Sequence, residues 1–257
     1  MSNFPVHPVP EHFRDAHITP ERYREMYQRS VEDPAAFWDE QAREFLSWDQ
    51  PWDTVVDYDF REGRASWFAG GKLNVSVNCI DRHLASRADQ TALIWEGDDP
   101  SASQKITYRE LHEQVCRLAN VLRVRGVKKG DRVCIYMPMV PEAAYAMLAC
   151  TRIGAIHSVV FGGFSPTAIV DRIQDADCQT VITADEGRRG GKTIALKANV
   201  DKALESCPNV HTCIVARVTE AEVDWQEGRD VCYREATVAA DTVCEPESMD
   251  AEDPLFI

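Results

Sequence analysis

The chain has 257 residues, of which 44% are hydrophobic and 27% charged, a composition typical of soluble globular proteins with one large or two smaller domains. Its 42 acidic residues outnumber its 28 basic residues and give a net charge of −14. A negative field of this size argues against nucleic acids and anionic membranes as partners. It also requires a local basic patch wherever the chain binds a polyanion.

The cysteines and the N-terminus indicate a cytoplasmic protein. The nine cysteines are odd in number, form no CxxC pair and fall partly inside apolar runs, which predicts buried reduced thiols rather than a disulfide framework. The first residues, MSNFPVHPVPEHF, have neither the positive nor the apolar region of a signal peptide. No stretch approaches the roughly 18 apolar residues that a membrane span needs.

Residues 1–75 are rich in aromatic side chains and show little periodicity. We expect one or two helices within 20–47, in a segment that wraps around the rest of the chain and is anchored to a core by its aromatic rings. An aromatic cage for a ligand is the alternative, although packing explains the same residues more simply. The aromatic residues in question are Phe37, Trp38, Phe45, Trp48, Trp52, Tyr58, Phe60, Trp67 and Phe68.

Residues 76–257 show short apolar runs that alternate with longer amphipathic segments. Thr107 and Glu110 form a capping box that begins a helix with an apolar stripe, and Gly126 ends that helix. Strands separated by helices predict right-handed crossovers, a mostly parallel sheet and a layered α/β fold. Strands are expected over 92–96, 133–137, 156–161, 180–184 and 212–216, a polar loop over 97–104, and further helices over 141–153, 165–175 and 193–205.

The end of the chain carries a weaker pattern. Residues 219–230 and 238–253 are acidic and without periodicity, which favours a solvated surface. The apolar run 254–257 resembles the beginning of a strand, so the sequence predicts a chain interrupted there.

The stretch DEGRRGGKT at 185–193 is a candidate anion site. It lies between an expected strand and an expected helix, where backbone amides and a helix N-terminus attract anions, and it carries Arg189 and Lys192. A Walker A loop would need its first glycine at 186, where this chain has Glu186, so a P-loop NTPase is disfavoured. A solvated loop with a flexible glycine pair is the alternative that the residues leave open.

The stretch FGGFSPT at 161–167 forms a second turn between strand and helix. Thr167 stands where the serine-hydrolase elbow has its last glycine, and Pro166 makes Ser165 a helix cap rather than a nucleophile. The turn is either a tight connection of small residues or a glycine edge against which a ligand lies. The seven histidines are scattered, so no metal site is expected.

Three segments together resemble the AMP-forming acetyl-CoA synthetases of the adenylate-forming superfamily. They are WFAGGKLN at 67–74 leading to NCIDRH at 78–83, ITYREL at 106–111, and GAIHSVVFGGFS at 154–165 taken with DEGRRGGK at 185–192. The resemblance covers nearly the whole chain. It divides the chain into an N-terminal region, 1–75, and a partial AMP-binding domain, 76–257, that stops before the phosphate loop.

The resemblance implies a ligase that converts acetate, Mg-ATP and CoA to acetyl-CoA, AMP and pyrophosphate through acetyl-AMP, without a prosthetic group. Relatives often have Arg at the position of Lys192, and lysine keeps the charge but loses the bidentate fork. The implied CoA-binding residues are Phe161, Gly162, Gly163, Arg189, Gly190, Gly191 and Lys192.

The same resemblance places the catalytic residues and the ATP and Mg²⁺ sites beyond residue 257, so these 257 residues are expected to be inactive alone. A propionyl-CoA synthetase remains an alternative, because no residue of an acyl pocket is present. A Rossmann-type nucleotide-binding regulatory module is the alternative from another functional class.

Overall fold

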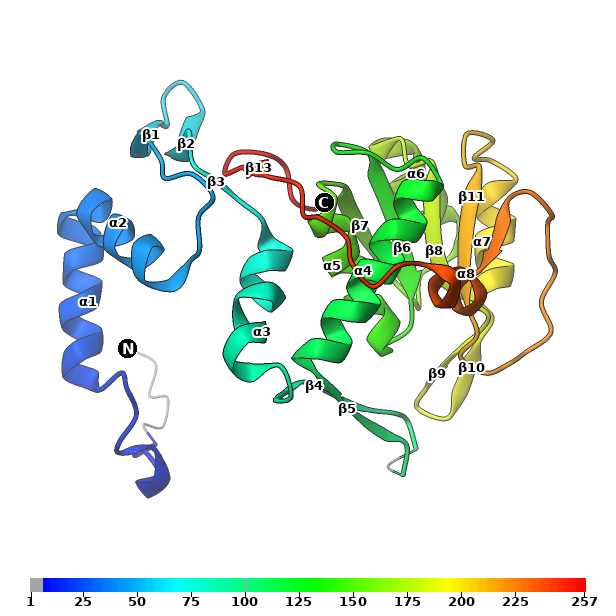
Figure 1. Cartoon of the computed structure of the whole chain (residues 1–257), viewed down its shortest axis with the longest axis horizontal. Helices are drawn as coiled ribbons and strands as arrows, with labels where there is room; N and C mark the ends of the chain where they lie inside the picture. The colour runs from blue at the N-terminus through cyan, green and yellow to red at the C-terminus, as the bar shows by residue number, and fades with distance from the viewer. Residues whose placement is uncertain (1–6, 100) are drawn as a thin grey trace, which may run out of the picture.

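A computed structural model describes residues 7–99 and 101–257, which form an α/β domain with an N-terminal arm at one side (Figure 1). The arm comprises residues 7–73. The predicted α/β class is confirmed.

The centre of the α/β domain is a sheet of five parallel strands. Their order across the sheet is β12 (Asp230–Cys232), β11 (Thr212–Ala216), β8 (Thr180–Ala184), β6 (Arg132–Met137) and β7 (Ile156–Phe161). The four strands predicted within 133–216 therefore lie in one sheet. The fifth, β12, was not predicted. From β6 the chain first adds β7 on one side and then β8 on the other. A sheet that changes direction in this way has a crevice at the carboxyl ends of the central strands.

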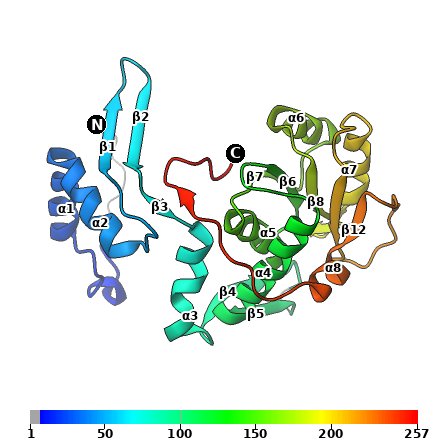
Figure 2. The same ribbon diagram turned by 45° about the horizontal axis from the view of Figure 1, so that its top comes forward.

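Helices cover both faces of this sheet (Figure 2). On one face α4 (Tyr108–Val124) contacts both α5 (Pro141–Arg152) and α8 (Tyr233–Ala239); on the other, α6 (Pro166–Ala176) contacts α7 (Leu196–Leu204). Every residue of β8 and β11 is buried, as expected for parallel strands covered on two sides. This explains why the strands appear in the sequence as continuous apolar runs.

The predicted capping box begins α4. Thr107 Oγ1 accepts the Glu110 N–H at 3.2 Å, and the Glu110 carboxylate accepts the Thr107 N–H at 2.8 Å. Gly126 follows the helix with a φ of +90°, a conformation that favours glycine. Both predicted boundaries of this helix are confirmed.

Two antiparallel hairpins flank the carboxyl end of the sheet. The first joins β4 (Thr91–Glu96) to β5 (Ser103–Thr107). The polar loop expected over 97–104 is therefore shorter than predicted, because its last two residues belong to β5. The second joins β9 (Gly187–Arg189) to β10 (Lys192–Ile194). The helix expected over 193–205 is wrong at its start, because residues 192–194 are a strand and α7 begins at Leu196.

The arm holds two helices, as predicted, and an unpredicted hairpin. Its elements are a 3-10 turn η1 (Glu11–Phe13), α1 (Pro20–Glu32), α2 (Pro34–Phe45), β1 (Thr54–Asp59) and β2 (Arg64–Ala69). The ring centroids of Trp48 and Trp52 are 4.8 Å apart, and those of Trp52 and Phe68 are 4.9 Å apart. These aromatic side chains pack on one another within the arm and not on the core of the α/β domain, so packing is favoured over a ligand cage but the predicted anchoring to that core is wrong.

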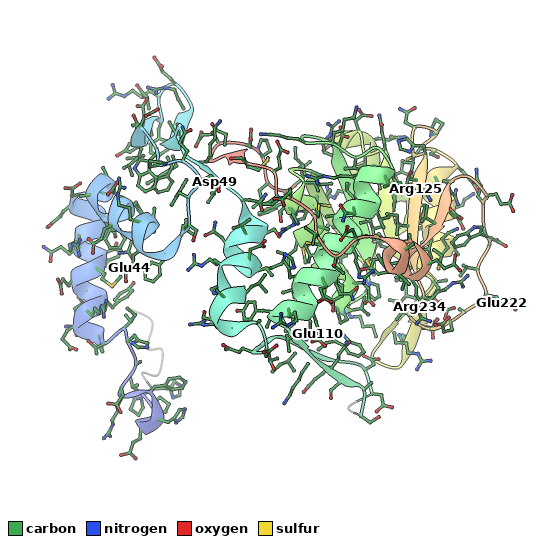
Figure 3. All side chains as sticks on the ribbon, viewed as in Figure 1. Glu44, Asp49, Glu110, Arg125, Glu222 and Arg234 are labelled. Carbon is green, nitrogen blue, oxygen red and sulfur yellow. The ribbon has the colours of Figure 1, made fainter. Side chains whose placement is uncertain are left out.

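The last residues of the chain connect the arm to the α/β domain. Strand β3 (Lys72–Leu73) pairs with β13 (Met249–Asp250), and Ser248 Oγ donates to the carboxylate of Asp49 at 3.1 Å. Figure 3 labels Asp49 in the arm. Phe256 then forms a parallel bridge with His157 in β7. The apolar run 254–257 thus begins to pair at the sheet edge, in line with the strand start expected there.

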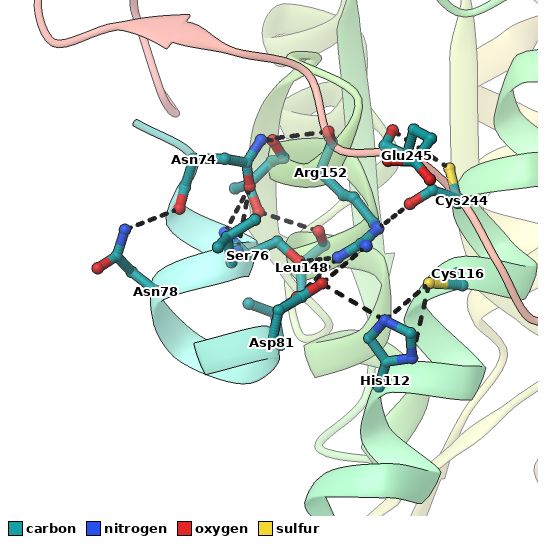
Figure 4. A network of polar contacts seen from close by, with 12 residues as sticks. Asn74, Ser76, Asn78, Asp81, His112, Cys116, Leu148, Arg152, Cys244 and Glu245 are labelled. Atoms are coloured by element: carbon teal, nitrogen blue, oxygen red, sulfur yellow. Dashed lines mark hydrogen bonds and ion pairs between the residues drawn. The ribbon is translucent and has the colours of Figure 1, made fainter. Parts of the chain in front are cut away.

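A buried polar network lies where the arm meets the domain (Figure 4). Between them run the π-helical turn η2 (Val77–Asp81) and α3 (Arg82–Arg87). The Arg152 guanidinium donates to both carboxylate oxygens of Asp81, at 2.8 and 2.9 Å, and His112 Nε2 lies 3.5 Å from the same carboxylate. Asn74 donates to the carbonyls of Thr151, Arg152 and Glu247. The network joins η2, α4, α5 and residues 240–257 after α8, which we call the C-terminal strap.

Two further expectations concern thiols and membranes. All nine cysteines are free thiols, and seven of them are buried. In the described residues, no helix has the length and apolar character needed to cross a bilayer.

Candidate binding site at the carboxyl edge of the sheet

The hairpin β9–β10 carries the predicted cations, but it places them differently from the expectation. Gly190 and Gly191 have φ values of +57° and +74° and form the two-residue turn of the hairpin. Consecutive residues with positive φ are the signature of the turn that matches strand twist, and glycine adopts it without steric cost. Arg189 and Lys192 therefore stand opposite each other on strands, and a helix N-terminus does not supply the anion site.

Three of the predicted residues meet in space. The Cζ atom of Arg189 lies 4.7 Å from the centroid of the Phe161 ring, a cation–π contact. A Cβ on Gly163 would lie 2.9 Å from the Phe161 ring and 3.7 Å from Arg189 Nη1. A side chain at Gly163 would displace the ring, so this glycine permits the stacking of Arg189 on Phe161.

A cavity of about 250 Å³ opens beside this contact, at the carboxyl ends of β6, β7 and β8. Its surface is mostly apolar, with two guanidinium groups and one carboxylate. The lining residues are Asp98, Met137, Pro138, Met139, Phe161, Gly162, Gly163, Gly187, Arg188, Arg189, Ile194 and Leu196. Gly190, Gly191 and Lys192 do not line it and lie exposed at the hairpin tip.

Glycines allow the close approach of backbones around the cavity. A Cβ on Gly187 would lie 2.9 Å from Pro138 Cβ, and one on Gly162 would lie 3.1 Å from the Met137 carbonyl oxygen. Both contacts join the turn after β6 to a neighbouring segment. Gly162, a predicted site residue, and Gly187, which was not predicted, thus shape the cavity wall.

Tyr136, which the sequence did not indicate, supports the turn that carries Phe161. Its side chain is fully buried, and its hydroxyl lies 2.9 Å from the Phe164 carbonyl and 3.2 Å from the Gly162 carbonyl. Asn199 Nδ2 donates to the same hydroxyl at 3.3 Å. Burial raises the pKa of Tyr136, against the opposing hydrogen bond from Asn199, so the hydroxyl stays protonated and can donate.

The carboxylate of Asp185, directly after β8, is already hydrogen-bonded to backbone groups of nearby residues. Its buried carboxylate accepts backbone N–H groups of Glu186, Val218, Thr219 and Ala221. It therefore fixes the turn after β11. Among the described residues no group of three His, Cys, Asp or Glu side chains could hold a metal ion.

Ser165 is a helix cap, as its sequence context predicts. Its Oγ accepts the Ala168 N–H at 3.4 Å at the start of α6. The cavity lining contains neither a histidine nor a serine. Its apolar floor and cationic rim suit the binding of a flat apolar group next to an anion, rather than acid–base chemistry.

Arg188, from the basic stretch 185–193, also lines the cavity, and so does Asp98, which was not predicted. Asp98 lies in the polar turn of the first hairpin, and its carboxylate accepts the N–H of Gly191 at 3.0 Å. No periodicity marks such a residue, because its role depends on a segment far along the chain.

The chain is similar to known families along most of its length. The family model for AMP-binding enzymes matches residues 80–257, and the model for the acetyl-coenzyme A synthetase N-terminus matches residues 23–79.

Individual relatives also match the chain over nearly its whole length. The chain is 62% identical to acetyl-coenzyme A synthetases of Alkalilimnicola ehrlichii and Saccharophagus degradans over its full length, which is 40% of theirs. It is 67% identical to acetyl-coenzyme A synthetase 2 of Pseudomonas putida over 95% of this chain and 38% of that protein. The solved structure of acetoacetyl-CoA synthetase from Streptomyces lividans superposes with a TM-score of 0.81 at 28% identity, over 91% of this chain and 35% of that one.

Proposed function

Because this chain belongs to the AMP-binding enzyme family, we propose that it is the N-terminal part of an AMP-forming acetate–CoA ligase. The match to the acetyl-coenzyme A synthetase N-terminus and the 62–67% identity to synthetases of that name favour acetate over propionate as substrate. The chain spans about 40% of the length of these relatives, so most of the ligase would lie outside it.

The reaction that we propose has two steps. An acetate oxygen attacks the α-phosphorus of Mg-ATP and releases pyrophosphate, which leaves acetyl-AMP. The CoA sulfur then attacks the acetyl carbon and releases AMP. In the described residues no acid–base pair or metal cluster accompanies the cavity, so we assign binding rather than bond-making to this part of the enzyme.

We assign the cavity at the carboxyl edge of the sheet to the nucleotide end of CoA. The observation that carries this assignment is Arg189, held over Phe161 at the cavity rim in a chain of net charge −14. An adenine ring can lie against Phe161 and the flat glycine edge of Gly162 and Gly163. The guanidinium of Arg189 can then donate to the ribose phosphate. Lys192, opposite Arg189 in the hairpin, adds a second positive charge, with Gly190 and Gly191 forming the turn between them.

Replacing Arg189 by alanine tests the assignment in the full-length ligase. We expect the KM for CoA to rise about tenfold or more, because charge-assisted hydrogen bonds contribute about 1.5–3 kcal/mol each. Acetate-dependent ATP–pyrophosphate exchange should change little, since adenylation precedes CoA binding. The measurement is steady-state kinetics of both half-reactions.

Lys202→Ala is the matched control, because Lys202 is an exposed cation that pairs with Glu205 on α7. CoA lacking its 3′-phosphate should show little difference between the Arg189→Ala variant and the parent enzyme. The assignment is wrong if Arg189→Ala leaves the KM for CoA unchanged, or if both half-reactions decline together with the melting temperature.

A further inference from the structure

Among the described residues, a single side-chain hydrogen bond, here called the tether, holds the tip of the β9–β10 hairpin. Gly190 and Gly191 have no atoms within 4 Å of where a Cβ would stand, so nothing packs on the turn. Among the hydrogen bonds of the described residues, the one between Gly191 N–H and the Asp98 carboxylate, 3.0 Å long, joins this tip to another part of the chain. The tips of the two hairpins also approach each other in Figure 1.

The hairpin that carries Asp98 is itself anchored to the cavity. Trp95 Nε1 donates to the Met139 carbonyl at 2.7 Å, in the turn after β6 that forms the cavity floor. Gly97 N–H donates to the Ala102 carbonyl at 2.7 Å and closes the hairpin behind Asp98. A continuous connection therefore runs from the sheet through Trp95 and Asp98 to the glycine turn.

The charge of Asp98 makes this contact informative. Its carboxylate lines the same cavity as Arg188 and Arg189, where it would repel a bound phosphate. An acid at this place weakens anion binding unless it contributes something else. The contribution visible in the structure is the strong acceptor that it presents to a glycine turn with two positive φ values.

We propose that Asp98 is a positioning residue of the CoA nucleotide site. It holds the Gly190–Gly191 turn, and with it Arg189 and Lys192 on either side, in the geometry that receives a ribose phosphate. The inference rests on the proposed function for its ligand, but the tether can be tested without CoA.

Two substitutions separate the tether from the charge. Asp98→Asn keeps an oxygen acceptor and removes the negative charge, whereas Asp98→Ala removes both. A positioning role predicts that Asp98→Ala raises the KM for CoA about threefold to tenfold, whereas Asp98→Asn leaves it unchanged or lowers it. Glu96→Ala, on the same hairpin and not in the cavity lining, is the charge control and should leave it unchanged.

The exchange rate of the Gly191 amide, measured in the full-length enzyme without CoA, reports directly on this hydrogen bond. Asp98→Ala should speed exchange at the Gly191 amide about tenfold, while Asp98→Asn should have a smaller effect and Glu96→Ala none. Unchanged exchange in Asp98→Ala, or an equal fall in the KM for CoA in both Asp98 variants, would overturn the proposal. If the exchange responds while Arg189→Ala leaves the KM unchanged, the tether stands and the assignment to CoA fails.

Discussion

At the scale of single residues, the most informative group is formed by the buried Arg152 and the half-buried Asp81 and His112. Burial opposes ionisation of Asp81, but hydrogen bonds from His112 and Arg152 outweigh it and lower its pKa to about 2. The bond to Asp81, with a smaller contribution from Cys116, raises the pKa of His112 to about 9. The cationic histidine thus completes an ion pair at the base of the arm.

The raised pKa of His112 predicts a loss of stability in alkali. A histidine whose pKa rises on folding stabilises the protein fully below about pH 6.5, and this contribution disappears as the pH passes about 9. Asp81 acts oppositely: its contribution is complete above about pH 4 and is lost as the pH falls toward 2. Between pH 6 and pH 9.5, the loss of the charge on His112 should by itself lower the free energy of unfolding in urea by about 2–3 kcal/mol.

His112→Gln supplies the comparison, because glutamine can still donate to Asp81 without titrating. The variant should be less stable at pH 6, and its loss of stability between pH 6 and pH 9.5 should be smaller by about 2–3 kcal/mol. Equal pH dependence in both proteins would show that His112 does not carry this effect.

At the scale of secondary-structure elements, the sequence predicted those that local pattern determines. The strands β6, β7, β8 and β11 are continuous apolar runs because the sheet is covered on both faces. The strand β12 is three residues long and includes the charged Asp230, so no periodicity could reveal it. Its place depends on the ion pair between Asp230 and Lys197, two residues far apart in sequence that only the fold brings together.

The hairpin β9–β10 in the candidate site is a second element that the local sequence pattern could not predict. The glycine pair was expected in a loop that opens a helix, with a solvated loop as the alternative, whereas the pairing of Gly187–Arg189 with Lys192–Ile194 makes it a hairpin turn. The glycines and Arg189 could be named from the family resemblance. Neither Asp98 nor Tyr136 could be found in that way, since each acts through a partner distant in sequence.

A buried lysine attaches α7 to β12, and its removal tests that attachment. Lys197 Nζ lies 2.7 Å from Asp201 and 2.9 Å from Asp230, with side-chain exposures of 1% for Lys197 and 0% for Asp230. Lys197→Met should destabilise the protein by about 3–5 kcal/mol, because it leaves the buried carboxylate of Asp230 with one partner fewer. Thermal and chemical denaturation measure the loss.

Lys202→Met is the control on the same helix. Lys202 pairs with Glu205 at the surface, with both side chains more than 60% exposed, so its loss should change stability by less than about 1 kcal/mol. If the two variants lost similar stability, burial would not explain the role of Lys197.

At the scale of the whole molecule, Asn74 joins three segments. Its side chain is 2% exposed, donates to carbonyls of α5 and of the C-terminal strap, and accepts the N–H groups of Ser76 and Val77. The side chain therefore couples the arm to the α/β domain at one buried point.

Asn74→Ala should loosen the arm while the α/β domain stays folded. Several buried hydrogen bonds are lost at once, at a cost of about 2 kcal/mol or more. Limited proteolysis should then cut within residues 74–88 much faster than in the parent protein, and a protected fragment containing the five-stranded sheet should remain. Asn78→Ala, at a more exposed position of the same segment, should have a smaller effect. Unchanged cleavage in Asn74→Ala would mean that Asn74 does not control the junction.

The pairing of β3 with β13 has a consequence for the order of folding. Strand β3 leaves the ribosome early, and its partner emerges only after all five strands of the parallel sheet have been made. At typical rates of synthesis the delay is on the order of ten seconds or more. During that interval the arm has its own aromatic packing but no strap, so it can dock only after the sheet is complete. Contacts between segments so far apart in sequence form slowly. Pairing of β13 with β3 is therefore expected to follow the formation of the five-stranded sheet.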